Sequence, residues 1–145
     1  MVKVFEDYFS ELQTDMVAIC LEYAHDKADN VYIYCSIEDN MFSVGFFYKI
    51  NGKILKRHEI NKENPECDVT VGMQKQVMQI LMDDLKKIQE KFIQFDREMP
   101  TEMKLIYDVN TNKMSADYNY EKAISGDSSI TAYDMEKKWF GQLEV

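Results

Sequence analysis

A chain of 145 residues has the length of one ordinary domain, so we expect residues 1–145 to form a single domain. Acidic residues outnumber basic ones by 26 to 17, and the formal net charge is −9. This charge argues against nucleic acid and against an anionic membrane surface as partners, because both are bound through basic surfaces. It favours a basic protein as the partner, although acidity also serves solubility alone.

The cysteines and the start of the chain indicate a reduced, cytoplasmic protein. The three cysteines cannot all pair within one chain. Cys20 and Cys35 occupy apolar positions of predicted elements, whereas Cys67 falls in a polar loop and is expected to be the exposed one. Residues 1–15 lack the apolar run of a signal peptide, and no stretch approaches the ~20 apolar residues of a membrane span.

Residues 3–25 are predicted to form an amphipathic helix. Apolar residues recur there at spacings of three and four, which places them on one stripe. The stripe consists of Val4, Phe5, Tyr8, Phe9, Leu12, Met16, Ile19, Cys20 and Tyr23. Acidic side chains fall largely on the rest of the helix surface.

Three predicted strands follow this helix. Residues 31–38 and 42–50 alternate apolar and polar side chains with a period of two. Asp39-Asn40 joins them as a turn, and Asn51-Gly52 is a strong hairpin signal because both residues tolerate positive φ. Residues 53–60 supply the third strand, which completes an antiparallel meander.

The second half of the chain repeats both kinds of element. A helix is predicted over residues 71–95, strands over 103–109 and 114–120, and a last helix over 132–143. The element order is therefore α-βββ-α-ββ-α, and strands joined by hairpins must pair antiparallel. We expect an α+β domain with an antiparallel sheet of about five strands and helices packed on it.

Three aromatic side chains lie on the strand faces opposite to the predicted core: Tyr32, Tyr34 and Phe47. Helices that cover both faces of the sheet would explain them. The alternative is an exposed aromatic patch of the kind found in binding hot spots. The pattern favours helix cover.

The sequence contains little that predicts catalysis. His25 falls at a predicted helix end and His58 on a predicted strand face, and neither has a cysteine or histidine partner at the spacing of a metal site. Anionic neighbours would raise the pKa of Cys67 and blunt its reactivity. The glycine-rich, nucleophile and metalloprotease motifs are also missing. We therefore predict no catalytic residues, no metal and no cofactor.

Two zones of the chain are strongly acidic. Residues 1–30 contain seven acidic and two basic residues, and residues 101–136 contain seven acidic and three basic ones. The second zone includes a strand face with alternating acidic and amide side chains, which could meet a basic surface. The alternative is an ordinary solvated face of an antiparallel sheet. The predicted partner-binding residues are Asp117, Asn119, Glu121, Asp108 and Asp127.

Four short motifs follow one another along the chain. They are Val31-Tyr32-Ile33-Tyr34, Val44-Gly45-Phe46-Phe47-Tyr48, Met114-Ser115-Ala116-Asp117-Tyr118-Asn119-Tyr120-Glu121 and Lys138-Trp139-Phe140. In this order they resemble the YezG-like (EsaG-like) family of bacterial immunity proteins. The resemblance covers the chain from about residue 30 and agrees with the predicted order of elements. The chain resembles a divergent member, because Met99-Pro100-Thr101 stands where the family has an aromatic residue before the fourth strand.

The resemblance implies an antitoxin that stays in the cytoplasm of the producing cell. Such proteins neutralise a toxin exported by the type VII secretion system, commonly a nuclease. A nuclease presents a basic surface to its substrate, and an acidic protein is able to mask that surface. Two alternatives are kept. One is a chaperone or adaptor for a secretion substrate, and the other is a small enzyme or ligand-binding domain with a cleft between the sheet and the helix at 71–95.

Overall fold

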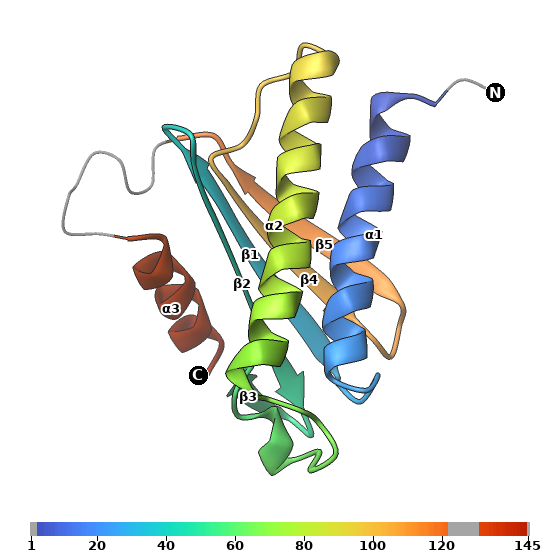
Figure 1. Ribbon diagram of the computed structural model, residues 1–145, viewed down its shortest axis with the longest axis vertical. Helices are drawn as coiled ribbons and strands as arrows, with labels where there is room; N and C mark the ends of the chain where they lie inside the picture. The colour runs from blue at the N-terminus through green and yellow to red at the C-terminus, as the bar shows by residue number, and fades with distance from the viewer. Residues whose placement is uncertain (1–2, 122–130, 145) are drawn as a thin grey trace.

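The computed structural model describes residues 3–121 and 131–144, and its elements confirm the predicted α+β fold and the order α-βββ-α-ββ-α. A five-stranded antiparallel sheet has two long helices on one face and a short helix on the other (Figure 1). The strands are β1 (Asn30–Glu38), β2 (Met41–Ile50), β3 (Lys53–Lys56), β4 (Glu102–Asp108) and β5 (Lys113–Asn119). Their order across the sheet is β3-β2-β1-β4-β5, so β1 is central and β5 is an edge strand.

Helices α1 (Phe5–Tyr23) and α2 (Val71–Gln94) lie side by side over what we call the inner face of the sheet (Figure 1). Both begin with a local hydrogen bond: the Asp7 carboxylate accepts from the Val4 N–H at 3.1 Å, and the Thr70 hydroxyl accepts from the Met73 N–H at 3.3 Å. The apolar stripe of α2 is fully enclosed and consists of Val77, Leu81, Leu85, Ile88 and Phe92. None of the described helices combines the length and the apolar run that crossing a membrane requires.

The two predicted tight turns form as expected. Asp39 and Asn40 have φ values of 50° and 64°, and Asn51 and Gly52 have φ values of 52° and 78°. Positive φ at both central residues matches the twist of the flanking strands, which explains why two residues suffice in each hairpin. Local turn chemistry therefore sets the register of β1, β2 and β3.

The third strand is shorter than predicted, and His58 lies in an exposed turn and not on a strand face. β3 ends at Lys56, and the short 3₁₀ helix η1 (Ile60–Lys62) begins soon afterwards. The Glu59 carboxylate accepts a hydrogen bond from the Lys56 N–H at 3.0 Å, which closes the turn. Ile60 was expected to end the strand, but it enters the core from this 3₁₀ helix.

Helix α3 (Ala132–Leu143) covers part of the outer face of the sheet, so helices do pack on both faces. Its Trp139 ring lies 5.7 Å from the Tyr32 ring and 5.2 Å from the Phe47 ring, measured between centroids. Tyr34 and Phe140 complete this outer cluster. The three aromatic residues singled out in the sequence are therefore buried under α3, and the interpretation as an exposed patch is wrong.

Candidate partner-binding site

The predicted site lies on the hairpin of β4 and β5, at the edge of the sheet farther from α3 (Figure 1). β5 pairs with β4 only, and within the described residues no strand lies along its other edge. In the β4–β5 register Asp117 stands opposite Lys104, and Asn119 stands opposite Glu102. Because side chains alternate along a strand, Asp117 and Asn119 point to the outer face, as predicted.

Asp117 and Glu121 are exposed carboxylates. Neither side chain makes a hydrogen bond or an ion pair with another described residue. Glu121 lies just beyond the end of β5, so it extends the row of Asp117 and Asn119 past the strand and does not belong to the strand face itself. Both side chains are therefore accessible to a partner.

Asp108 and Asn119 have structural roles. The Asp108 carboxylate accepts hydrogen bonds from the N–H groups of Asn110 at 3.0 Å and Thr111 at 3.2 Å, which stabilises the turn between β4 and β5. The side-chain oxygen of Asn119 accepts from the Glu121 N–H at 3.0 Å. These two side chains shape the backbone that carries Asp117 and Glu121.

The structure does not gather the predicted residues into one cluster. Asp108 pairs with Lys113 at one end of the hairpin, whereas Asn119 pairs with Glu102 at the other. Six residues separate Asp108 from Glu102 along β4, which corresponds to about 20 Å. Asp127 lies outside the described residues. The compact part of the predicted site is therefore Asp117, Asn119 and Glu121.

The two acidic zones of the sequence lie side by side in the fold, because α1 runs next to β5 (Figure 1). Gln13 donates a hydrogen bond to the Tyr118 hydroxyl at 2.9 Å, and the Phe9 and Tyr118 rings are 5.9 Å apart. The exposed acidic residues of α1 are Glu6, Asp7, Glu11, Asp15 and Glu22. Some of them are already paired: Glu6 contacts Arg97 at 2.9 Å, and Glu11 contacts Lys3 at 3.1 Å.

A groove between α1 and the β4–β5 hairpin adds an apolar component that the sequence did not indicate. It encloses about 300 Å³, and its walls are Thr14, Val17, Ala18, Leu21, Tyr107, Asn112 and Met114. Met114 is 38% exposed and Tyr118 is 39% exposed, although both face α1. Because β5 is at the edge of the sheet, α1 covers them only partly.

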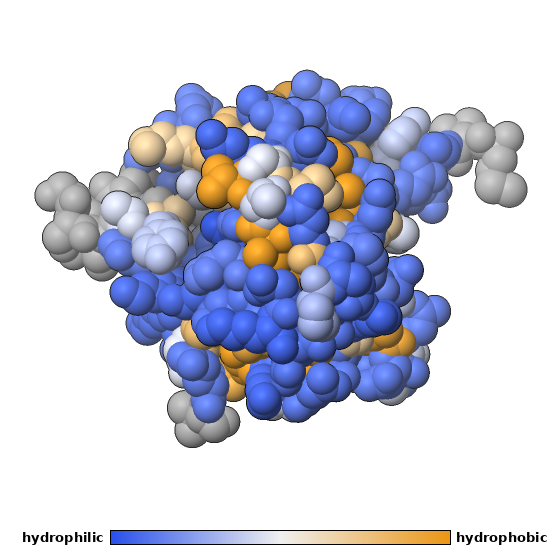
Figure 2. All heavy atoms as spheres, turned by 60° about the horizontal axis from the view of Figure 1, so that its bottom comes forward, coloured by the Kyte–Doolittle hydropathy of each residue, from blue (hydrophilic) through white to orange (hydrophobic). Residues whose placement is uncertain are grey.

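The wider surface is polar. Figure 2 shows one face of the molecule, on which hydrophilic side chains dominate and an apolar area near the middle is surrounded by them. Exposed apolar side chains of the described residues are scattered over several elements and include Val4, Met41, Val71, Ile93, Tyr120 and Tyr133. A partner on such a surface must be recognised largely through polar and charged contacts.

The cysteines are all buried, including Cys67, which the sequence analysis expected to be exposed. Cys67 lies in the loop before α2, which turns at this point: the Cys67 N–H donates a hydrogen bond to the Asn64 carbonyl at 3.0 Å. Burial, followed by the nearby Glu66 carboxylate, raises the pKa of the Cys67 thiol, which leaves it a poor nucleophile. No group of His, Cys, Asp or Glu side chains among the described residues is arranged to hold a metal ion.

An exposed acidic surface on a small α+β scaffold is compatible with binding a basic protein. The sequence pattern of the family described as "Immunity protein YezG-like" matches residues 5–142. The chain therefore belongs to the YezG-like immunity protein family, which confirms the resemblance seen in its motifs. No curated protein matches the chain.

Proposed function

We propose that this protein is an antitoxin, which binds a cognate toxin and neutralises it without catalysing a reaction. The toxin would be a nuclease exported by the type VII secretion system, and the antitoxin would meet it in the cytoplasm before export. Membership of the immunity protein family supports the general role. The nature of the toxin rests on the charge of the surface and on the family resemblance.

The observation that carries the proposal is the acidic side formed by α1 and β5. Two regions that are distant in the sequence place exposed carboxylates at the same edge of the sheet, those of α1 over the inner face and that of Asp117 on the outer face. The side chains of Asp117 and Glu121 have no partner among the described residues. The active surface of a nuclease is basic because its substrate is a polyanion. Complementary charge speeds the encounter of two proteins and excludes wrong partners.

The half-exposed apolar side chains at the edge of β5 suit the same contact. Met114 and Tyr118 border the acidic side, and the groove beside α1 offers a place for an apolar anchor of the toxin. Buried anchors slow the dissociation of a complex, whereas charges at the rim mainly affect association. We infer that the charged groups of this surface mainly set the association rate and that its apolar groups mainly set the dissociation rate.

The rival interpretation as a small enzyme or ligand-binding domain needed a cleft between the sheet and α2 that is lined by convergent polar groups. The core fills most of this space, with Leu81, Leu85 and Ile88 completely buried. An open groove of about 440 Å³ remains between β2 and α2, and Lys75 is the one charged side chain in its lining among the described residues. Binding to a protein remains the function that the described surface supports best.

Charge reversal tests the proposed contact. Asp117→Lys and Glu121→Lys should each lower the association rate with the cognate toxin by about 3- to 10-fold at low salt, because each removes an attraction and adds a repulsion. Stopped-flow or surface-based kinetics would measure the rate. Glu90→Lys is the matched control, since this exposed residue of α2 undergoes the same change of charge away from β5. Equal effects of the three substitutions on the association rate would show that Asp117 and Glu121 do not lie in the contact.

Inhibition must be measured alongside binding. Toxin that stays fully active in the complex would identify a chaperone or adaptor and contradict the proposed antitoxin role. Purified protein that turns over a substrate by itself would contradict the proposal of a binding protein.

A further inference from the structure

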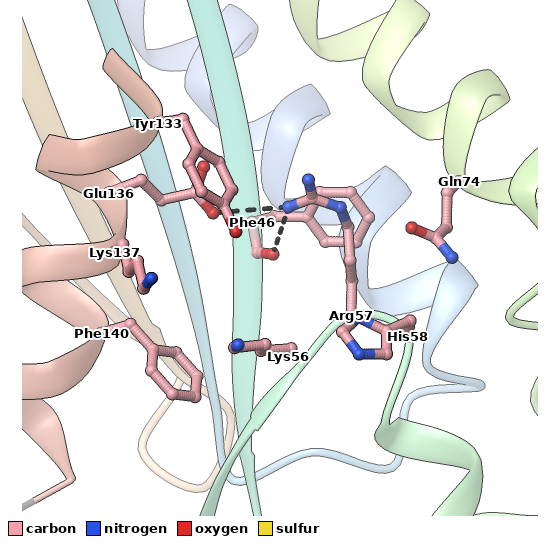
Figure 3. A pocket seen from close by; sticks show the side chains of 9 residues that line it. All are labelled: Phe46, Lys56, Arg57, His58, Gln74, Tyr133, Glu136, Lys137 and Phe140. Atoms are coloured by element: carbon pink, nitrogen blue, oxygen red, sulfur yellow. Dashed lines mark hydrogen bonds and ion pairs between the residues drawn. The ribbon is translucent and has the colours of Figure 1, made fainter. Parts of the chain in front are cut away.

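A small basic pocket lies where α3 faces the turn after β3, well away from the acidic side of α1 and β5 (Figure 3). It encloses about 120 Å³. Its lining comes from four parts of the chain: Phe46 on β2, the run Lys56-Arg57-His58, Gln74 on α2, and Tyr133, Glu136, Lys137 and Phe140 on α3.

The charge of this pocket is opposite to that of the whole molecule. Lys56, Arg57 and Lys137 contribute three cationic groups, and Glu136 is the one carboxylate in the lining. Glu59 and Glu144 lie outside this lining, in the adjoining hollow that Lys56 and Lys137 also border. A chain with a net charge of −9 has only 17 basic residues, so three of them around one small pocket make a local positive field. An anion near this side of the molecule would be drawn to it.

The guanidinium of Arg57 is held in place at the centre of the pocket. Its Nη1 donates to the Phe46 carbonyl at 3.2 Å and to the Glu136 carboxylate at 3.4 Å, and its Cζ lies 5.3 Å from the centre of the Phe46 ring (Figure 3). Among the described residues, the other N–H groups of this side chain make no hydrogen bond. A planar guanidinium with free donors matches the two oxygens of a carboxylate.

The walls of the pocket are aromatic. Phe46 is completely buried, Phe140 is 8% exposed, and Tyr133 is 60% exposed at the mouth. The ammonium of Lys56 lies 5.7 Å from the centre of the Phe140 ring, so cations and apolar surface alternate around the opening. A ligand with a charged head and a short hydrocarbon stem would satisfy both kinds of wall.

From this geometry we propose that the pocket binds a carboxylate carried on a short aliphatic stem, with Arg57, Lys56 and Lys137 as its cationic contacts. Two sources present this chemistry: an acidic side chain of a partner protein and a free short-chain carboxylic acid. The pocket is distinct from the acidic side formed by α1 and β5, so the proposal does not depend on the toxin contact.

Propionate is the probe for the first experiment. Titration into ¹⁵N-labelled protein at constant ionic strength should give saturable NMR shifts at residues 56–58 and 133–140, with a Kd of about 1–30 mM. Propionamide has the same shape without the charge and should give no saturable shift. Absence of saturation below about 100 mM propionate, or equal binding of propionamide, would overturn the proposal.

Two neighbouring lysines of α3 provide a matched pair of variants. Lys137 lines the pocket and Lys138 does not, although both are exposed and both substitutions remove one positive charge. Lys137→Gln should weaken propionate binding by about 3- to 10-fold, and Lys138→Gln by less than about 2-fold. Exposed positions on a helix surface tolerate this change without loss of the fold. Equal weakening in the two variants would contradict a defined site.

Propionate binding to the complex with the toxin distinguishes the two sources of the carboxylate, which are an acidic side chain of the toxin and a free carboxylic acid. If toxin displaces propionate and Lys137→Gln weakens toxin binding more than Lys138→Gln does, the pocket receives an acidic side chain of the toxin. If the complex still binds propionate, the pocket serves a free carboxylic acid. A protein that binds toxin normally but fails the propionate titration would overturn this site and leave the proposed function intact.

Discussion

At the scale of single residues, the least expected feature is a buried acid between the two long helices. Asp84 belongs to the inner side of α2 and is only 4% exposed, and its Oδ2 atom has no hydrogen-bond partner among the described residues. Burial, together with the nearby carboxyl group of Asp15 on α1, raises the pKa of Asp84 from 3.8 to about 8. The raised pKa favours the protonated form of Asp84 in the folded protein at neutral pH.

This raised pKa makes the stability of the protein depend on pH. Between pH 4 and pH 8 the folded state holds a proton on Asp84 that the unfolded chain has released, so the free energy of unfolding falls as pH rises through this range. Above pH 8 the stabilising proton is lost from the folded state as well. Asp84→Asn removes the ionisable group. The free energy of unfolding of this variant relative to wild type should therefore be about 1–3 kcal/mol more favourable at pH 9 than at pH 4.

Urea unfolding at pH 4, 7 and 9 measures the effect. Glu90→Gln is the control, because Glu90 is an exposed carboxylate on the same helix and the substitution removes the same charge. Its effect should stay within about 0.5 kcal/mol at each pH. Parallel pH profiles for wild-type protein and Asp84→Asn would show that Asp84 does not carry a raised pKa.

At the scale of elements, α3 is fixed to the sheet by a close contact at Gly45. A Cβ atom at Gly45 would lie 1.8 Å from Oε1 of Glu136, so the carboxylate occupies the space that any other residue needs. Glu136 is held there by Arg57. Burial raises the pKa of Glu136, and the Arg57 guanidinium opposes that shift. Gly45, Glu136 and Arg57 form one unit that joins β2, α3 and the turn after β3.

Gly45→Ala should therefore destabilise the protein by about 1–3 kcal/mol, although alanine normally favours a strand over glycine. In a Glu136→Ala background the same substitution should cost less than half as much, because the obstructing side chain is gone. Chemical denaturation of the four proteins measures the cycle. Gly72→Ala is the control, since a Cβ atom there meets nothing within 4 Å. Additive effects of Gly45→Ala and Glu136→Ala would contradict the proposed unit.

The sequence predicted elements better than it predicted their contacts. Period-two alternation and the turn residues Asn51 and Gly52 identified the strands, because both signals are local. The end of β3 at Lys56 was missed, because the chain turns there where the Glu59 carboxylate accepts the Lys56 N–H. The basic pocket was also missed because its walls come from four parts of the chain, and the position of Asp84 was missed because its burial depends on α1.

The candidate site was predicted in part. Alternation along β5 placed Asp117 and Asn119 on one face, and the structure shows the same orientation. The neighbourhood of α1 and β5 could not be read from the sequence, because it depends on the order of strands in the sheet. The structural role of Asp108 in its turn also escaped prediction, although Asp108-Val109-Asn110-Thr111-Asn112 is rich in turn residues that could have indicated it.

At the scale of the whole molecule, charge is unevenly distributed. The acidic side of α1 and β5 and the basic pocket beside α3 lie at opposite edges of the sheet (Figure 1). An approaching basic toxin would be oriented by this arrangement before any contact forms. We expect the electrostatic contribution to appear in the rate of association and much less in the rate of dissociation.

Salt dependence tests this expectation. Raising NaCl from 50 to 500 mM shortens the screening length from about 14 to about 4 Å and should lower the association rate with the toxin by about 10-fold or more. The dissociation rate should change by less than about 3-fold. Kinetics of the Asp117→Lys variant at the same two salt concentrations serve as the control, and its salt dependence should be weaker. An association rate that is independent of salt would contradict steering by charge.

The protein contains a single tryptophan, Trp139, and it lies in the outer cluster, separated by the sheet from the main core. This placement provides an optical probe for one part of the molecule. The fluorescence emission of Trp139 reports whether α3 is packed on the sheet, whereas circular dichroism reports the helical content of the whole protein. Whether α3 leaves the sheet before the remainder unfolds, or when a toxin arrives, is thereby open to measurement without any added label.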